Sequence, residues 1–368
     1  MKILFVLNSY SGIKKFIDFS KSYEEINEKI TRFYQSWHQD FYFLSKKKNH
    51  CEVIYPTLIN DYLKKKNTDS LNFLDKKIKN LKPDIIFSTV NTDEINSVIA
   101  KNSSRECKSI IWYSAYVDKR DLLKLKYQYN YIITDNIKIK KLSDFINFKS
   151  FFLMISIPKN ASRKKNFNSR KNNLYFSGSL SSKFNYRNKI LNFISKYQTT
   201  YFRIRHIPEK YKLLNFINAL LIKFFPNFSK DLYKKKILPL TNNLKFFNKN
   251  EIYGKNLFDE MSNFKFCINC HSDFDRNSSI NMRVFESLSC GNLLFTDDHF
   301  FMKKYFRDKE HLIYYANEED LIMKIRYYKN NLDQAKKIAN KGQNFILSSH
   351  NTVIRYKKFL SILKTIKS

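Results

Sequence analysis

The chain has 368 residues, of which 43% are hydrophobic, and 67 lysines and arginines against 33 aspartates and glutamates give a formal net charge of +34. This length exceeds one ordinary domain and suits two, and the hydrophobic content is enough for buried cores. The charge favours nucleic acid, anionic membrane or phosphorylated partners. Because the basic residues are spread from end to end without an arginine-rich arm, we do not expect a dedicated nucleic-acid binder.

The cysteines and apolar runs indicate the compartment. Five scattered cysteines, an odd number, favour a reducing environment over a disulfide framework. The first apolar run is too short for a signal peptide, and no stretch approaches the ~18–20 apolar residues of a transmembrane helix. We therefore expect a cytoplasmic protein, with peripheral binding to the inner face of the plasma membrane as an alternative.

Short apolar runs alternate with helix-length polar segments through the first half of the chain. The expected strands are Ile3–Leu7, Glu52–Tyr55, Asp84–Val90, Ser109–Tyr113, Tyr131–Thr134 and Phe151–Ile157. This alternation is typical of a parallel sheet covered by helices on both faces. We expect an α/β fold with a Rossmann-like domain over residues 1–158, followed by a basic, polar linker over 159–173.

A second α/β domain is expected over residues 174–368. Its expected strands are Leu174–Phe176, Tyr201–Ile204, Phe264–His271, Asn292–Asp298 and residues 311–315, with helices from Glu318 onward. The alternation breaks at residues 207–250, where the segment 213–225 is apolar at helical spacing. We interpret 207–250 as a helical insertion packed on its own domain, with a membrane-surface helix as the alternative. Gly342 is interpreted as an ordinary interruption of the terminal helices.

The most informative segment is residues 264–298. It predicts a buried strand, a polar loop, a short helix over Asn281–Cys290, a glycine stop at Gly291 and a second buried strand. Arg283 and Glu286 are three residues apart, so they share one helix face just beyond the carboxyl end of a strand. Ligands of open α/β sheets bind at such edges. A cation beside a carboxylate suits a ligand with phosphates and sugar hydroxyls, although a solvated ion pair is the commoner explanation.

The string from Asn281 to Asp297, NMRVFESLSCGNLLFTD, resembles the C-terminal domain of bacterial glycosyltransferases of the group-one, CgeB-like (spore-maturation) type. Segments 172–187, 252–271 and 348–360 resemble further pieces of that family in the expected order. The resemblance implies a GT-B fold, in which two Rossmann-like domains face a central cleft that holds a nucleotide-sugar. It also implies transfer without a bound metal or other cofactor.

The resemblance implies roles for individual residues. Glu286 matches the second Glu of the Glu-x7-Glu motif of related group-one transferases and would hold the donor ribose. Ser279 stands at the position of the first Glu, which puts a carboxylate contact with the donor sugar in doubt. Arg187 or Arg283 would supply positive charge beside the diphosphate leaving group, which cations and the amides of a helix N-terminus stabilise.

Three further residues belong to the expected donor site. Gly178 and Ser179 follow a predicted strand, where a Gly-Ser turn lets the backbone approach a phosphate. Asn269 lies at the end of another strand, from which its amide would reach the cleft.

An inverting transferase also needs a base to deprotonate the acceptor hydroxyl, and the N-terminal half offers candidates. His38, Asp93 and Asp118 each lie after a strand or on a helix near the expected cleft. A solvated or helix-capping role is the alternative for each, since Asp is a favoured cap.

Other motifs favour no competing chemistry. Cys267-Ile-Asn-Cys270-His271 matches the C-x-x-C-H signature of haem attachment, but it lies in an apolar strand and no export signal accompanies it. Zinc would need two further ligands at suitable spacing. No G-x-G-x-x-G or G-x-x-x-x-G-K-[ST] occurs, which disfavours a dinucleotide oxidoreductase and a P-loop kinase.

Together these observations predict a metal-independent glycosyltransferase that moves a sugar, a hexose by preference, from a nucleotide-sugar to a cell-surface glycan or lipid-linked acceptor. Two alternatives stay open. One is a basic, non-catalytic module that binds nucleic acid or anionic membrane. The other is a catalytically degenerate, transferase-like scaffold, which the serine at position 279 would suit.

Overall fold

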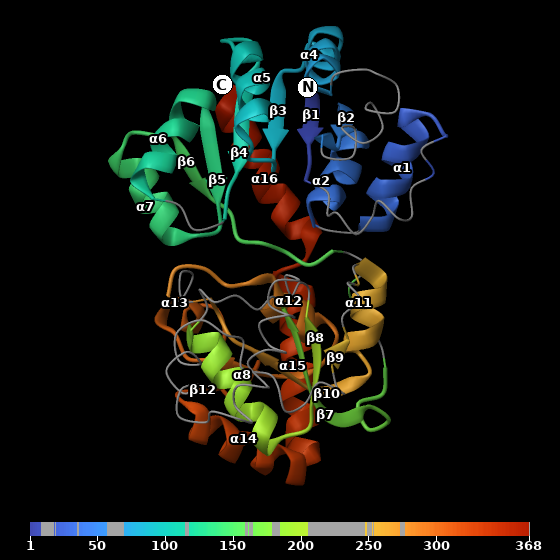
Figure 1. The fold of residues 1–368 in the computed structure, drawn as a ribbon, viewed down its shortest axis with the longest axis vertical. Coiled ribbons are helices and arrows are strands. Elements are labelled where there is room, and N and C mark those ends of the chain that lie inside the picture. The colour runs from blue at the N-terminus through green and yellow to red at the C-terminus, as the bar shows by residue number, and fades with distance from the viewer. Residues whose placement is uncertain are drawn as a thin grey trace, which may run out of the picture. The chain divides into compact units, whose positions relative to one another are not determined.

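The computed structural model describes residues 1–8, 18, 20–34, 37–56, 70–114, 118–158, 161, 165–178, 185–204, 247–248, 252, 254–272 and 277–367. The chain divides into two compact units, each of which is a sheet flanked by helices (Figure 1). Unit 1 comprises residues 1–160 and 350–368, and unit 2 comprises residues 161–349. Each unit is built on its own six-stranded parallel sheet.

The sheet of unit 1 has the strand order β2-β1-β3-β4-β5-β6. Its strands are β1 (Lys2–Val6), β2 (His50–Ile54), β3 (Ile85–Ser88), β4 (Lys108–Trp112), β5 (Tyr131–Thr134) and β6 (Ser150–Phe152). Its helices are α1 (Tyr23–Tyr34), α2 (Trp37–Lys46), α4 (Ser70–Leu81), α5 (Asp93–Asn102), α6 (Lys119–Gln128), α7 (Ile137–Phe145) and α16 (Thr352–Lys367). The central strands are almost wholly buried because helices cover both faces, which is why they read as unbroken apolar runs.

Helix α16 completes the core of unit 1, although it follows unit 2 in the chain. The ring of Phe359 stacks on that of Phe41 with centroids 4.8 Å apart. The hydroxyl of Tyr356 donates a hydrogen bond of 3.1 Å to Ser45 Oγ. These contacts assign the last helix to the first sheet.

The expected domain boundaries are corrected accordingly. Residues 350–368 belong to unit 1, whereas the sequence placed them in the domain 174–368. The expected linker 159–173 is largely part of unit 2, because unit 2 starts at residue 161 and its first strand starts at Lys171. Apolar spacing shows that a helix has a buried face but not which sheet covers that face. The expected insertion 207–250 lies outside the described residues, apart from one short strand at 247–248.

The sheet of unit 2 has the order β12-β11-β10-β7-β8-β9. Its strands are β7 (Lys171–Gly178), β8 (Thr200–Ile204), β9 (Phe247–Asn248), β10 (Phe264–Asn269), β11 (Leu293–Asp297) and β12 (Ile313–Tyr315). Its helices are α8 (Asn185–Tyr197), α11 (Gly254–Met261), α12 (Met282–Ser289), α13 (Phe300–Lys303), α14 (Glu318–Asn330) and α15 (Leu332–Ser349). The chain runs outward from β7 through β8 and β9, and then returns to β10 on the other side of β7. The carboxyl ends of β7 and β10 therefore form a topological switch point, where open α/β sheets bind ligands.

Local sequence signals are confirmed around α12. Asn281 is its N-cap and Cys290 its C-cap, and Gly291 follows with a φ of +70°. This left-handed conformation is the reason for a glycine at that position.

Two local predictions are corrected. The strand expected over Phe151–Ile157 is shorter in the structure, where β6 ends at Phe152 and Ile157 forms an isolated bridge with Asn351. Gly342 lies inside α15 and does not interrupt the helices. A glycine is required there because a Cβ would lie 2.2 Å from the backbone carbonyl oxygen of His311. The glycine permits a close helix-to-backbone approach.

Candidate functional site

The candidate site lies at the switch point of unit 2, where the first turn of α12 meets the end of β7. Arg283 in that turn donates from Nε to the carbonyl oxygen of Ser177 on β7 at 3.1 Å. The N-cap Asn281 makes no side-chain capping bond in the described part of the chain. The N-terminus of a helix suits an anion through its dipole and its first amides. In α12 one of these amides, that of Val284, also donates to the carbonyl oxygen of Asn281 at 3.2 Å.

Arg283 and Glu286 form the ion pair that their spacing predicts, through Nη1 and Oε2. The side chain of Glu286 is only 10% exposed. Burial raises the pKa of this carboxyl, and the positive charge and hydrogen bond of Arg283 act in the opposite direction. Because a carboxylate can accept about four hydrogen bonds, one arginine leaves acceptor capacity for the hydroxyls of a ligand.

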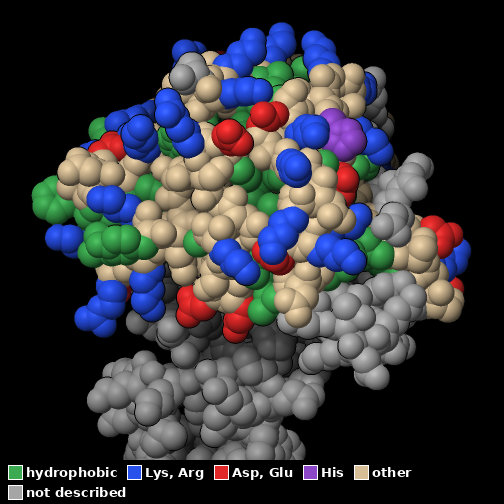
Figure 2. All heavy atoms as spheres, turned by 90° about the horizontal axis from the view of Figure 1, so that it is seen from above, with side chains coloured by type: hydrophobic (Ala, Val, Ile, Leu, Met, Phe, Trp, Pro, Cys, Tyr) green, Lys and Arg blue, Asp and Glu red, His purple; other side chains and the backbone are tan. Residues whose placement is uncertain are grey.

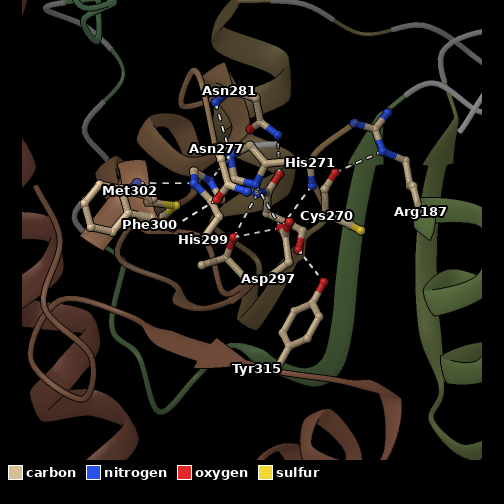
Figure 3. Close-up of polar contacts among 12 residues, drawn as sticks. Arg187, Cys270, His271, Asn277, Asn281, Asp297, His299, Phe300, Met302 and Tyr315 are labelled. Carbon is tan, nitrogen blue, oxygen red and sulfur yellow. Dashed lines mark hydrogen bonds and ion pairs between the residues drawn. The ribbon is translucent and has the colours of Figure 1, made fainter. Parts of the chain in front are cut away.

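Arg187 reaches the same edge from α8. It is buried, and its Nε donates to the carbonyl oxygen of Cys270 at 2.9 Å, just after β10 (Figure 3). Gly178 ends β7, and a Cβ there would lie 2.8 Å from the ring of Phe176. The structure thus brings Gly178, Arg187, Arg283 and Glu286 to the carboxyl edge of one sheet. Ser179 lies outside the described residues.

Asn269 also lies at this edge, but both ends of its amide bind the protein. Its Nδ2 donates to Thr296 Oγ1 on β11 at 3.0 Å, and its Oδ1 accepts from Asn281 Nδ2 at 2.8 Å. It therefore ties β10 to β11 and to the N-cap of α12. This is a supporting arrangement, whereas the sequence suggested that the amide faces the ligand.

Two functional features of unit 2 escaped the sequence analysis, and the first is a buried polar cluster behind Asn269. Asp297 is fully buried and accepts from the backbone N of His271 at 3.0 Å and from its Nδ1 at 2.8 Å. Burial would raise the pKa of Asp297, but its electrostatic interaction and hydrogen bonds with His271 outweigh this and lower the pKa to about 2. The signal in the sequence was a strand that ends in Thr-Asp, which an apolar count overlooks.

The second missed feature is Arg170. Its buried guanidinium donates from Nη1 to the carbonyl oxygens of Cys290 at 2.9 Å and Gly291 at 2.8 Å. A cation at the carboxyl end of a helix complements the helix dipole, so Arg170 stabilises α12 from the end opposite the site. Because it stood in a stretch of several basic residues, nothing local distinguished it.

The base candidates all belong to unit 1. The ring of His38 lies on α2 with its centroid 5.7 Å from that of Trp112, edge to face. Burial lowers the pKa of His38 to about 3, so the ring stays neutral and is a weak base in this state. Asp118 is the N-cap of α6 and accepts from the backbone N of Asp121 at 2.9 Å. Asp93 is exposed in the first turn of α5.

The haem-like motif is part of the core. The side chains of Cys267 and Cys270 are buried, and burial raises the pKa of the Cys267 thiol beyond the ordinary range. A buried, protonated thiol in a sheet is inert, so the motif is a coincidence of a strand sequence. Within the described ranges, no three His, Cys, Asp or Glu side chains gather in a way that could hold a metal ion.

Comparison with known proteins places this geometry in context. Residues 224–361 match the model of a family described as glycosyl transferase-like. No curated protein matches the chain. Among solved structures, Anabaena Alr3699/HepE in complex with UDP and glucose has a TM-score of 0.62 at 11% identity, covering 99% of this chain and 100% of that one. Sucrose-phosphate synthase from Thermosynechococcus elongatus has a TM-score of 0.60 at 8% identity, covering 100% and 99%. A glycosyltransferase from Rickettsia africae ESF-5 has a TM-score of 0.58 at 15% identity, covering 99% and 98%.

The chain has the GT-B fold. Its two parallel sheets correspond to the two Rossmann-like domains of these glycosyltransferase structures over almost their whole length. The glycosyl transferase-like match includes α12 and β11, and therefore the Arg283–Glu286 pair. No helix among the described residues is long and apolar enough to cross a membrane.

Proposed function

We propose that the protein is a nucleotide-sugar-dependent glycosyltransferase whose unit 2 binds the donor at the carboxyl ends of β7 and β10. The observation that supports this most strongly is the buried Glu286, paired with an arginine that is itself anchored to β7. Burial raises the pKa of the Glu286 carboxyl and so opposes its ionised form. Ionisable groups with perturbed pKa values cluster at functional sites. The neighbour in complex with UDP and glucose gives the ligand class.

The proposed roles follow from the chemistry of the donor. Glu286 accepts hydrogen bonds from the ribose hydroxyls, which are charge-assisted and therefore strong. Arg283, Arg187 and the amides of the first turn of α12 stabilise the negative charge that develops on the departing diphosphate. Because these fixed cations supply the charge, transfer needs no metal ion in this proposal. EDTA should then leave the rate unchanged.

Finer features are proposed on the same basis. The string NMRVFESLSCG, which covers α12 and its caps, supports a CgeB-like subtype and a hexosyl group as the transferred sugar. The acceptor would be a cell-surface glycan or a lipid-linked sugar. A base from unit 1 would deprotonate it if the reaction inverts, with Asp93, Asp118 and His38 as candidates.

We also propose that unit 1 contacts an anionic membrane at the inner surface of the cell. Figure 2 shows Lys and Arg side chains over the whole described part of one face of unit 1, with fewer acidic ones between them. Phe145 and Tyr127 are 73% and 84% exposed, and Lys119 Nζ lies 5.0 Å from the ring centroid of Phe145. Exposed aromatic rings beside lysines suit the headgroup region. Flotation with phosphatidylserine vesicles should weaken in a Phe145→Ser/Tyr127→Ser variant.

Calorimetry with single nucleoside diphosphates and their sugars tests the donor site. We expect saturable binding of one nucleotide, which Glu286→Ala and Arg283→Ala abolish. A matched control is Glu310→Ala, because Glu310 pairs with Arg307 at the same spacing but on the exposed surface of unit 2. If no nucleoside diphosphate or nucleotide-sugar binds the wild-type protein, the proposal fails.

A basic, non-catalytic module is the second candidate, favoured by the charge of +34. Such a module would bind polyanions with a steep dependence on salt and would be insensitive to Glu286→Ala. The same calorimetric series, repeated with a polyanion at two salt concentrations, separates the two functions.

A further inference from the structure

Behind the donor-facing residues, three buried side chains form a continuous polar chain from β11 to α13. Asp297 accepts from His271 Nδ1 at 2.8 Å, and His271 Nε2 lies 3.3 Å from His299 Nε2. The Nδ1 of His299 accepts from the backbone N of Met302 at 3.2 Å, which caps α13 (Figure 3). We call Asp297, His271 and His299 the histidine chain.

The directed hydrogen bonds of the histidine chain favour one placement of its protons. In this placement the 3.3 Å contact between Asn269 Nδ2 and His271 Nδ1 joins two donors, so it is not a hydrogen bond. Since Nδ1 of His299 accepts a backbone N–H, the proton of that ring must be on Nε2. That proton points at Nε2 of His271, which must therefore carry a lone pair. The proton of His271 is then on Nδ1 and is donated to Asp297. A second proton on either ring would place an N–H where its neighbour needs an acceptor.

The histidine chain is connected directly to the segment that leads into α12. The backbone N of Asn281, the N-cap of α12, points at Nε2 of His271 at 3.5 Å. The Oδ1 of Asn277 accepts from the backbone N of Phe300 at 3.0 Å, at the start of α13. Residues 277–281 are thus held between β10 and α13 immediately before the turn that carries Arg283.

The identity of residue 299 is informative. Capping α13 needs only a short side-chain acceptor, for which Asn or Ser is preferred. A histidine caps the helix and also reaches His271, at the expense of burying a second imidazole. Buried polar networks hold their members in one arrangement, because breaking a hydrogen bond in the interior is costly.

We infer that His271, Asp297 and His299 are positioning residues for donor binding: they fix the N-cap of α12 and, through it, the first-turn amides and Arg283. This inference rests on the proposed function. The three side chains are too deeply buried to touch the donor themselves, since His271 and Asp297 are 0% exposed.

Two substitutions remove the contact between the rings while each keeps one neighbouring hydrogen bond. His299→Asn retains a good cap for α13 but does not reach His271. His271→Asn retains a donor toward Asp297, where Nδ1 was, but removes the acceptor that faces Asn281. We expect each to raise the Kd of the nucleoside diphosphate about five- to tenfold, the effect of one lost buried hydrogen bond.

The control is His311→Asn. His311 is also buried in unit 2, and its ring stacks on Phe345 with centroids 4.0 Å apart, so its loss lowers stability while leaving the N-cap and first turn of α12 in place. We expect a similar fall in melting temperature with unchanged Kd. If His299→Asn and His271→Asn keep the wild-type Kd, or lose no more affinity than His311→Asn does, the positioning role is refuted.

Long-range ¹H–¹⁵N spectra of the wild-type protein test the proton arrangement without any ligand. The expected result is His271 protonated on Nδ1 and His299 on Nε2, with the signals assigned by their loss in the two variants. An imidazolium, or the opposite tautomer in either ring, would overturn the inference even if nucleotide binds. If the tautomers are as expected but wild-type protein binds no nucleotide, the proposed function is what fails.

Discussion

Replacing Glu286 by glutamine should separate the stability of unit 2 from its affinity for the donor. Burial raises the pKa of the Glu286 carboxyl above its ordinary value of 4.5, despite the opposing effect of Arg283. For a raised pKa, the contribution to stability is complete below the unfolded-state pKa and is lost as the pH rises through the folded-state pKa. At neutral pH the ionised carboxylate is therefore a net cost to folding, which glutamine does not carry.

The effect on binding has the opposite sign. A hydrogen bond to a charged group contributes about 1.5–3 kcal/mol, and glutamine keeps the shape of the side chain without the charge. Losing one such bond to the ribose corresponds to a rise in Kd of at least about tenfold. We expect Glu286→Gln to melt at or above the wild-type temperature at pH 7.5, with a smaller difference at pH 4.

Calorimetry and thermal unfolding of the same preparations measure both quantities. Stability that rises while affinity falls is typical of a residue retained for function. A Glu286→Gln variant that melts lower at pH 7.5 and binds the nucleotide as tightly as the wild type would refute the reasoning, because Glu286 would then be a structural ion pair.

Three further predictions concern the scaffold. Gly342→Ala should lower the free energy of unfolding by about 2 kcal/mol, because a Cβ 2.2 Å from the carbonyl oxygen of His311 causes overpacking that exceeds the gain in helix propensity. Chemical denaturation measures this difference, and a stabilised variant would contradict the prediction. Arg170→Met should lower the free energy of unfolding by about 2–4 kcal/mol, because two buried carbonyls lose their donor, and Arg170→Lys should recover part of this loss. A methionine variant as stable as the wild type in chemical denaturation would show that α12 does not depend on this cap. Asp118→Ala should cost about 1 kcal/mol and Asp118→Asn almost nothing, so a transferase rate that falls in the asparagine variant would identify Asp118 as the base, and an unchanged rate would leave it a cap.

Local features of the fold were predictable from the sequence because they depend on neighbouring residues. The strand Tyr131–Thr134 was predicted to the residue, and α12 has the caps and glycine stop that its sequence indicates. The Arg283–Glu286 pair follows from a spacing of three on a helix. Each of these depends on period, propensity or cap chemistry within a few positions.

Features that depend on distant partners were not predictable in this way. Arg170 acts on carbonyls 120 and 121 positions away, and Thr352 donates to the carbonyl of Ile157 across 195 positions. The sequence showed His271 only as part of a haem-like motif that we disfavoured, and it did not reveal its partners Asp297 and His299, which lie 26 and 28 positions away. Pattern analysis detects a buried face or a reactive residue type, but the partner is chosen by topology.

The return of α16 to the first sheet makes unit 2 an insertion within unit 1. Residues 1–160 and 350–368 must come together before the first core is closed, and Phe359 then covers Phe41 and Phe87. Domains generally fold as the ribosome delivers them, in order from the N-terminus. Unit 2 is therefore complete in the nascent chain before unit 1, and the N-terminal sheet keeps part of its apolar surface uncovered until α16 is translated.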